Sequence, residues 1–247
     1  MEHDTVRVVG MNIAGLPIGP SGAKYDSLRE FMTVYQISVL CLQELNNAWH
    51  KQPVEMRLRE RTQGWFPAIT TRSAWFSLYP SVTASVVGGT AIILQGDVVG
   101  RVKQSGIDPH GLGRWTWVKL RGFEGKSMLV VSAYRPFYNP GGECSVWSQH
   151  KTFFDSKHPP RLVDPRDAFI MDLVADLRPH YRSGSQIVMA MDTNEKEFHL
   201  ANNVIEVAFR EFGMEDICFF KHGRQNAPAT TNTGSKPIDT VMVTRSL

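Results

Sequence analysis

The stretch Met189-Ala190-Met191-Asp192-Thr193-Asn194-Glu195 is the part of the chain around which the rest is organised. A short apolar run, residues 186–191, ends in an acid, and an amide follows two positions later. Side chains alternate along an extended segment, so Asp192 and Asn194 face the same way. The stretch therefore predicts a buried strand that delivers a carboxylate and an amide to its rim.

A carboxylate beside a neutral amide suits the hydrolysis of a phosphodiester. The acid can accept a proton from water, and the amide can hold that water or an anionic oxygen. The alternative is a strand end at which Asp and Asn cap the turn before the next helix. On this stretch alone the turn is favoured, so the functional hypothesis depends on the rest of the chain.

The composition is that of a globular protein with a mild positive charge. Of the 247 residues, 42% are hydrophobic and 21% are charged, and the formal net charge is +3. These values exclude a disordered chain and permit a nucleic-acid partner without arguing for one. The three cysteines, Cys41, Cys144 and Cys218, are far apart, which argues against a disulfide framework and for a reducing compartment.

No segment of the sequence has the features of a membrane anchor. No apolar stretch approaches the roughly 20 residues that cross a bilayer, and the polar residues 1–7 lack the pattern of a signal peptide. We therefore expect an intracellular protein, with the nucleus as one location, and no stable membrane association.

Apolar periodicity predicts a β-rich core with helices outside it. Runs typical of strands are residues 6–13, 37–42, 65–70, 90–94, 98–102, 115–120, 127–133, 186–191 and 238–243. Helical spacing is found in residues 24–35, 53–61, 146–154 and 200–212, and a further helix begins at Asp164-Pro165. This pattern favours an α/β fold with a two-layered β core flanked by helices, in one domain spanning residues 1–247.

Polar side chains recur at the ends of these apolar strands. They are Asn12, Glu44, Tyr134, Asp192 with Asn194, and Asp239. A sheet brings strand ends together, so residues remote in sequence can line one pocket. One acid at a strand end has no special meaning, but several with an amide and a phenol call for an explanation.

Six short motifs resemble, in order along the whole chain, those of the endonuclease/exonuclease/phosphatase superfamily, the DNase I-like phosphodiesterases. GMNIAGL (10–16) resembles the opening strand with its active-site Asn, LQE (42–44) the metal-binding Q-E motif, and GGTAI (88–92) the glycine-started core strand. AYRP (133–136) resembles the Y-x-P motif, MDTN (191–194) the G-D-x-N motif, and GSKPID (234–239) the late S-x-I-D motif. The Q-E-L and S-x-I-D pieces look most like apurinic endonuclease-like domains of non-LTR retrotransposons.

The resemblance implies a four-layer α/β sandwich of two packed, mainly antiparallel sheets flanked by helices. It also implies hydrolysis of DNA phosphodiester bonds with Mg²⁺, or with Mn²⁺ as an alternative cation. By this resemblance, Glu44 is the principal metal ligand and Asn12 supports the metal site. Asp192 orients or deprotonates the attacking water, and Asn194 and Tyr134 hold the phosphate oxygens. Asp239 would hydrogen-bond a catalytic His. Mg²⁺ prefers one or two carboxylates with water and substrate oxygens, in agreement with this set.

Three departures from the family pattern matter. Ala14 stands where the family often has Asp or Asn, and Phe137 replaces the Asn common after Y-x-P. The family's S-D-H motif does not follow Asp239, and none of the eight histidines lies beyond it. We interpret the chain as truncated, lacking one or more C-terminal strands and cleaving DNA poorly, with a degenerate inactive copy as the alternative.

The leading hypothesis is a DNA endonuclease, in one form the endonuclease domain of a retroelement. We expect a monomeric domain, fused in one scenario to a reverse transcriptase. Basic residues near the inferred site that could contact the DNA backbone are Arg114, Arg135 and Lys236, although each alone is more often a solvated charge. One alternative is a phosphoinositide or sphingomyelin head group as substrate, with WFSLY (75–79) as a membrane-facing loop. Another is a non-catalytic remnant that binds metal or nucleic acid.

Overall fold

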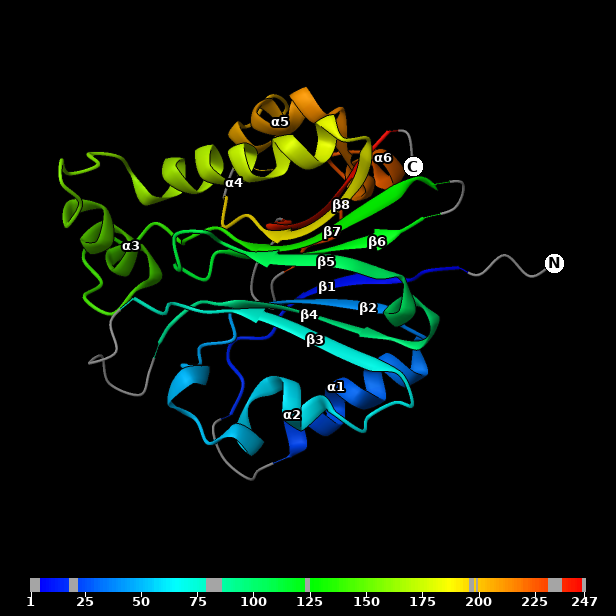
Figure 1. Cartoon of the computed structure of the whole chain (residues 1–247). Coiled ribbons are helices and arrows are strands. Elements are labelled where there is room, and N and C mark those ends of the chain that lie inside the picture. Colours follow the sequence, from blue (N-terminus) through cyan, green and yellow to red (C-terminus); the bar gives the residue numbers. More distant parts are fainter. Residues whose placement is uncertain are drawn as a thin grey trace.

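The protein is a sandwich of two β-sheets with helices on both outer faces, as Figure 1 shows. The computed structural model describes residues 5–17, 22–78, 86–122, 125–195, 198, 200–230 and 237–245. The predicted four-layer α/β architecture is therefore confirmed. None of the helices within these ranges is both long and apolar enough to cross a bilayer.

The first sheet has four strands in the order β1-β2-β4-β3. Its strands are β1 (Val8–Asn12), β2 (Val39–Gln43), β3 (Ile69–Ala74) and β4 (Thr90–Gln95). β1 and β2 are parallel, and a parallel pair needs a long crossover, which α1 (Ala23–Val34) provides. α1 and α2 (Leu58–Thr62) cover the outer face of this sheet, and the short helices η1 (Trp49–Lys51) and η2 (Val54–Met56) lie in the connection between β2 and α2.

The second sheet has six strands in the order β5-β6-β7-β8-β10-β9. Its strands are β5 (Val102–Ile107), β6 (Trp115–Arg121), β7 (Ser127–Tyr134), β8 (Ser185–Asp192), β9 (Met214–Asp216) and β10 (Asp239–Thr244). β7 and β8 are parallel, and α4 (Pro165–Arg182) is their crossover. β8 pairs antiparallel with β10 along its length, whereas β9 pairs only with Met242 to Thr244.

Helices cover the outer face of the second sheet and one end of the sandwich. α4, α5 (Val204–Phe209) and α6 (Ile217–His222) lie over the outer face, with η5 (Arg210–Phe212) after α5, and α3 (Val146–Asp155) lies at the end where α4 begins (Figure 1). As predicted, Asp164 caps α4, since its carboxylate accepts from the Arg166 backbone N–H at 2.7 Å, and Pro165 occupies the first turn.

The inner faces of the two sheets form a mainly apolar layer, crossed by hydrogen bonds of Gln43 with Ser132 and of Thr90 with Thr116. Its buried side chains include Val39, Cys41, Ile92, Val118 and Val130. Strands buried on both faces read as continuous apolar runs, which is why β2, β4, β7 and β8 could be recognised from the sequence.

One predicted strand is wrong and one is displaced. Residues 98–101 lie in the short helix η3 (Gly96–Arg101) instead of a strand, and Val102 begins β5. Gly96 adopts a positive φ of 72°, which turns the chain out of β4. The predicted strand at 65–70 lies instead at Ile69–Ala74. The following edge strand, β5, escaped prediction because most of its side chains are exposed and it lacks an alternating pattern.

Candidate active site

Strands from both sheets end at one edge of the sandwich and bring two carboxylates to a single amide. Asn12 ends β1, Glu44 follows β2, and Asp192 ends β8. The Asn12 Nδ2 donates to Glu44 Oε2 at 2.8 Å and to Asp192 Oδ2 at 2.8 Å. Residues 180 positions apart in sequence are thus held within one hydrogen-bonded cluster.

A close approach of the two sheets makes this cluster possible. A Cβ built on Gly10 would lie 2.7 Å from the Cβ of Ala190, a separation that real Cβ atoms do not show. Gly10 lies two residues before Asn12 on β1, and Ala190 lies two residues before Asp192 on β8. Because side chains repeat every second residue along a strand, the contact of small residues places Asn12 opposite Asp192.

The other predicted residues surround the cluster. Tyr134 is paired in register with Asp192, and its hydroxyl lies against the Asn194 side chain. The Asn194 Nδ2 donates to the Arg135 carbonyl at 2.7 Å, which ties the end of β7 to the turn after β8. Asp239 pairs in register with Asp192 from the other side. The structure therefore brings together every residue that we assigned a catalytic role.

The backbone around the cluster is strained. Ala14, Glu44 and Asn194 have φ values of 46°, 58° and 46°, although none of them is glycine. Such left-handed conformations cost of the order of 1–3 kcal/mol each and concentrate at functional sites. Local hydrogen bonds hold them, with the Asn194 N–H donating to Asp192 Oδ1 at 2.9 Å and the Ala14 N–H donating to Asn12 Oδ1 at 2.9 Å.

Burial and neighbouring acids shift the protonation of the cluster. Burial and the adjacent carboxylates of Asp239 and Glu44 raise the pKa of Asp192 to about 7, against the hydrogen bond from Asn12. Burial also raises the pKa of Asp239, whose Oδ1 has no hydrogen-bond partner among the described residues. Burial and the carboxylates of Glu44 and Asp192 raise the pKa of Tyr134 above its usual range, so its hydroxyl keeps its proton at neutral pH.

The donor set fits a hard divalent cation. Among the described residues, no basic side chain is a cause of the shift in the pKa of Asp192, and carboxylate oxygens are the ligands that Mg²⁺ prefers. No group of three or more His, Cys, Asp or Glu side chains in the described ranges is spaced to hold a metal ion. Glu44, with Asp192 beside it, would hold the cation incompletely, and water and substrate oxygens would supply the other ligands.

The arrangement gives Asn12 a positioning role beside the one that we expected. Its amide nitrogen donates to both carboxylates, and its oxygen accepts from the Ala14 N–H. A metal ion binds an amide through its oxygen, which keeps a second lone pair here, so the role of Asn12 at the metal site stays a prediction. In this geometry Asn12 positions the two carboxylates.

Two of the three basic residues expected to contact DNA are buried in ion pairs. Arg114 is 1% exposed and donates to both oxygens of Asp108 at 2.6 and 2.9 Å and to Asp172 at 2.8 Å. Arg135 is 3% exposed and donates to Glu195 at 2.7 Å. The prediction that these two guanidinium groups contact the substrate is therefore wrong, because their donors already serve carboxylates. Lys236 lies outside the described residues.

A positioning cluster beside the site escaped the sequence analysis. The Glu195 carboxylate accepts from Arg135 at 2.7 Å and from Arg166 at 2.8 Å. Arg166 also donates to the Asn194 carbonyl at 2.9 Å. The two arginines thereby fix the turn that carries Asn194. The sequence offered two signals of this cluster: Glu195 directly follows Asn194, and Arg166 lies in the first turn of the helix capped by Asp164.

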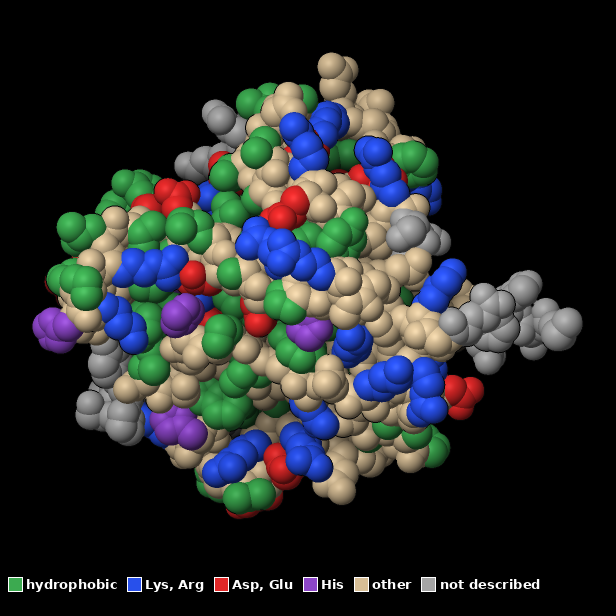
Figure 2. Space-filling model, turned by 45° about the horizontal axis from the view of Figure 1, so that its top comes forward, with side chains coloured by type: hydrophobic (Ala, Val, Ile, Leu, Met, Phe, Trp, Pro, Cys, Tyr) green, Lys and Arg blue, Asp and Glu red, His purple; other side chains and the backbone are tan. Residues whose placement is uncertain are grey.

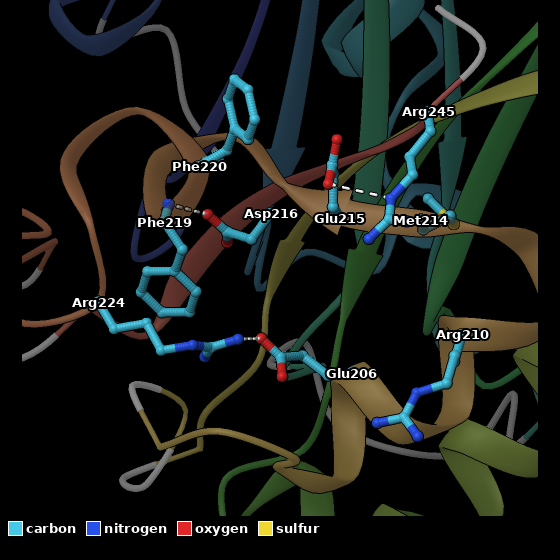
Figure 3. Close-up of a pocket in the computed structure, with 9 residues that line it drawn as sticks. All are labelled: Glu206, Arg210, Met214, Glu215, Asp216, Phe219, Phe220, Arg224 and Arg245. Carbon is cyan, nitrogen blue, oxygen red and sulfur yellow. Dashed lines mark hydrogen bonds and ion pairs between the residues drawn. The ribbon is translucent and has the colours of Figure 1, made fainter.

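A cavity of about 350 Å³ lies beside β9, α5 and α6 (Figure 3). It is lined by Glu206, Arg210, Met214, Glu215, Asp216, Phe219, Phe220, Arg224 and Arg245. It lies along β9 and α6, and its lining residue Asp216 pairs in register with Met242 of β10 and accepts a hydrogen bond from the Thr240 hydroxyl. Ion pairs of Arg224 with Glu206 and of Arg245 with Glu215 neutralise much of its charge. It contains none of the predicted catalytic residues.

The basic side chains do not gather in one region of the visible surface. On the face shown in Figure 2, Lys and Arg side chains are spread among acidic and hydrophobic ones, without a continuous basic band. This agrees with the small net charge of +3.

The comparisons with known proteins give structural matches alone. No family model matches the sequence, and no curated protein matches it. The 3′ phosphatase NExo from Neisseria, solved bound to a product DNA hairpin, is 12% identical with a TM-score of 0.59, covering 98% of this chain and 88% of that one. The endonuclease domain of TRAS1, a telomere-specific non-LTR retrotransposon, is 11% identical with a TM-score of 0.57, covering 98% and 85%.

A protein from Leptotrichia buccalis that carries the superfamily's name is 13% identical with a TM-score of 0.59, covering 98% of this chain and 89% of that one. At such low identities the similarity establishes the fold. Because it extends over nearly the whole chain and both sheets, the protein has the fold of the endonuclease/exonuclease/phosphatase superfamily, the DNase I-like α/β sandwich.

Proposed function

We propose that the protein hydrolyses phosphodiester bonds in DNA with the help of a divalent cation, at the strand-end cluster of Asn12, Glu44 and Asp192. The observation that carries the proposal is the Asn12 amide, which holds carboxylates of both sheets at 2.8 Å each. Two acids share one amide, and burial and neighbouring carboxylates raise the pKa of one of them, Asp192, to about 7, so that its ionised form is unfavourable for stability. Such an arrangement is typical of a catalytic site.

The residues of the cluster have complementary roles in such a reaction. In the metal-free protein the pKa of Asp192 is raised to about 7, and a carboxylate at this position could take a proton from the attacking water. Tyr134 keeps its proton and donates from its hydroxyl to a phosphate oxygen, and the amide of Asn194 beside it does the same. Glu44 would hold a Mg²⁺ or Mn²⁺ ion, which neutralises charge that develops on the phosphate.

DNA is favoured over other phosphodiesters by the kinds of protein that share the fold. NExo was solved with a DNA hairpin product, and TRAS1 contributes an endonuclease domain. The loop that could face a membrane, residues 75–79, gives no comparable support for a lipid head group in its described part. The Trp75 indole N–H donates to His50 Nδ1 at 3.0 Å and Phe76 is 3% exposed, while Tyr79 lies outside the described residues.

The test is a nicking assay on supercoiled plasmid in Mg²⁺ or Mn²⁺. The unaltered protein should nick the plasmid, EDTA should stop it, and Asp192→Asn should be slower by about 10²–10³, the usual cost of losing a preorganised catalytic contact. Asp97→Asn, an exposed acid in η3, is the matched control and should leave the rate unchanged. A protein that nicks nothing in either metal, or an Asp192→Asn variant as fast as the control, would refute the proposal.

A further inference from the structure

The loop that follows β7 exposes two adjacent aromatic side chains at the rim of the candidate site. Phe137 is 48% exposed and Tyr138 is 55% exposed, whereas residues 131–136 directly before them are all buried. Neither residue has a role in the cluster described above. Phe137 is also one of the departures from the family pattern noted in the sequence.

The backbone fixes this pair close to the reacting groups. Phe137 follows Tyr134 by three residues, so their Cα atoms lie within about 11 Å of each other. The intervening Arg135 is held from both sides, because its N–H donates to the Asp192 carbonyl at 3.0 Å and its carbonyl accepts from Asn194 at 2.7 Å. Any group bound at Tyr134 and Asn194 therefore has Phe137 within reach.

Packing from α3 supports one of the two rings. The rings of Tyr138 and Trp147 meet edge to face, with centroids 5.9 Å apart and planes at 80°. The Trp147 indole N–H donates to Asp164 Oδ2 at 3.2 Å, and Asp164 also caps α4. Tyr138 is thus held in place by a neighbour while more than half of its surface stays in solvent.

The chemistry of the loop indicates what it contacts. Residues 137–142, FYNPGG, contain no charged side chain, so the loop has no means of binding phosphate by ion pairing. Beside a bound phosphodiester, the uncharged and planar part of the substrate is the nucleobase. Aromatic rings bind bases by stacking, and every base offers a face for it.

We propose that Phe137 and Tyr138 form a stacking platform for an unpaired base next to the scissile phosphate. In a duplex both faces of a base are covered by its neighbours, so the platform selects single-stranded or locally unpaired DNA. This inference rests on the proposed function for the identity of the substrate, and it narrows that substrate from DNA in general to DNA with an exposed base.

The first test measures binding alone, in EDTA so that no hydrolysis occurs. The probe is a single-stranded 12-nucleotide DNA with one 2-aminopurine, whose fluorescence falls on stacking. Phe137→Ala should weaken binding by about 5- to 150-fold, as loss of one base–aromatic stack does, and should restore the fluorescence; Tyr138→Ala should act in the same direction. Phe220→Ala is the matched control, because Phe220 is 79% exposed on α6 beside the cavity of Figure 3.

A strand that lacks the base separates stacking from other effects. A strand of the same length made of abasic units throughout should bind the unaltered protein more weakly by at least the same factor, and Phe137→Ala should cost nothing further on it. If Phe137→Ala binds the intact strand as tightly as Phe220→Ala, or loses as much affinity on the abasic strand, the platform is refuted. The platform is also refuted if neither the unaltered protein nor any variant binds the strand at about 100 µM. It is refuted as well if the unaltered protein binds phosphatidylserine vesicles and Phe137→Ala does not, because the loop would then contact a lipid surface.

Cleavage assays distinguish this inference from the proposed function. If no DNA is cleaved but the stacking results hold, the hydrolytic function fails and the platform stands. If the protein cleaves single-stranded and duplex DNA equally, and Phe137→Ala changes neither rate, the platform fails while the hydrolytic function stands.

Discussion

Replacing Asp192 by Asn should stabilise the metal-free protein at alkaline pH while it removes activity. Burial and the neighbouring acids raise the pKa of Asp192 from 3.8 to about 7. A carboxyl whose pKa is raised in the folded state binds more protons there than in the unfolded chain, so its contribution to stability is complete below pH 3.8 and is lost as the pH rises toward 7. Above pH 7 the folded protein carries an unfavourable buried charge, which Asn does not have.

The expected size follows from the two pKa values. One pKa unit corresponds to 1.36 kcal/mol, so the charge on Asp192 costs roughly 4 kcal/mol of unfolding free energy at pH 8. Asn in turn loses one acceptor. The two Asp192 oxygens accept separately from Asn12 and from the Asn194 N–H, and an amide has one oxygen. The lost hydrogen bond costs about 1 kcal/mol at any pH. Asp192→Asn should therefore be about 1 kcal/mol less stable at pH 4 and about 3 kcal/mol more stable at pH 8.

Urea unfolding in EDTA at pH 4, 6 and 8 measures this difference directly. At each pH, the free energy of unfolding of the unaltered protein is subtracted from that of Asp192→Asn. The part of this difference that changes with pH reports the titration of Asp192, because the cost of the lost hydrogen bond is the same at every pH. Asp239 titrates in both proteins. Asp97→Asn is the control and should show no pH-dependent difference, since Asp97 is exposed. A stability difference between Asp192→Asn and the unaltered protein that stays constant from pH 4 to pH 8 would show that Asp192 is not held at a raised pKa, and the electrostatic account of the site would be wrong.

Three further variants probe the metal, the sheet contact and the positioning cluster. Glu44→Gln should weaken Mn²⁺ binding at least tenfold in a calorimetric titration, because the loss of a favourable charge contact of about 1.4 kcal/mol lowers the affinity by that factor. If Glu44→Gln and Asp97→Asn bind Mn²⁺ with equal affinity, Glu44 is not the ligand. Gly10→Val should lower the unfolding free energy by about 1–3 kcal/mol, because its Cβ has no room between the sheets; an unchanged urea midpoint would contradict the close approach. Arg166→Gln should lower the kcat for nicking about 10- to 100-fold with a smaller effect on KM, by misplacing the turn after β8, while Arg178→Gln, which breaks an exposed ion pair on the same helix, should not. Equal effects of the two would make Arg166 a purely structural residue.

The sequence was most informative where strands are buried. Asn12, Glu44 and Asp192 each follow an apolar run, and an apolar run that ends in a polar residue marks where a buried strand reaches the surface. The sheet then determines that these ends meet. The edge strand β5 gave no such signal, because Lys103, Gln104 and other exposed side chains interrupt its pattern.

The ion-pair partners of the charged residues could not be predicted from the sequence. Arg114 looked like a free cation, but its partners are Asp108, six residues earlier, and Asp172, on a helix 58 residues later. An ion pair across such a separation depends on how α4 packs against the end of β6, which local patterns do not encode. Arg135 was misjudged for the same reason, since its partner Glu195 reaches it from the turn after β8.

The central claim is that the strand-end cluster is a divalent-cation site for phosphodiester hydrolysis. The most direct measurement is anomalous diffraction from crystals of the protein soaked in Mn²⁺. The account predicts a strong anomalous peak within about 2.3 Å of carboxylate oxygen from Glu44, with Asp192 beside it, and loss of that peak in Glu44→Gln crystals. A peak in the cavity lined by Glu206 and Glu215 instead, or no peak at the cluster at saturating Mn²⁺, would contradict it.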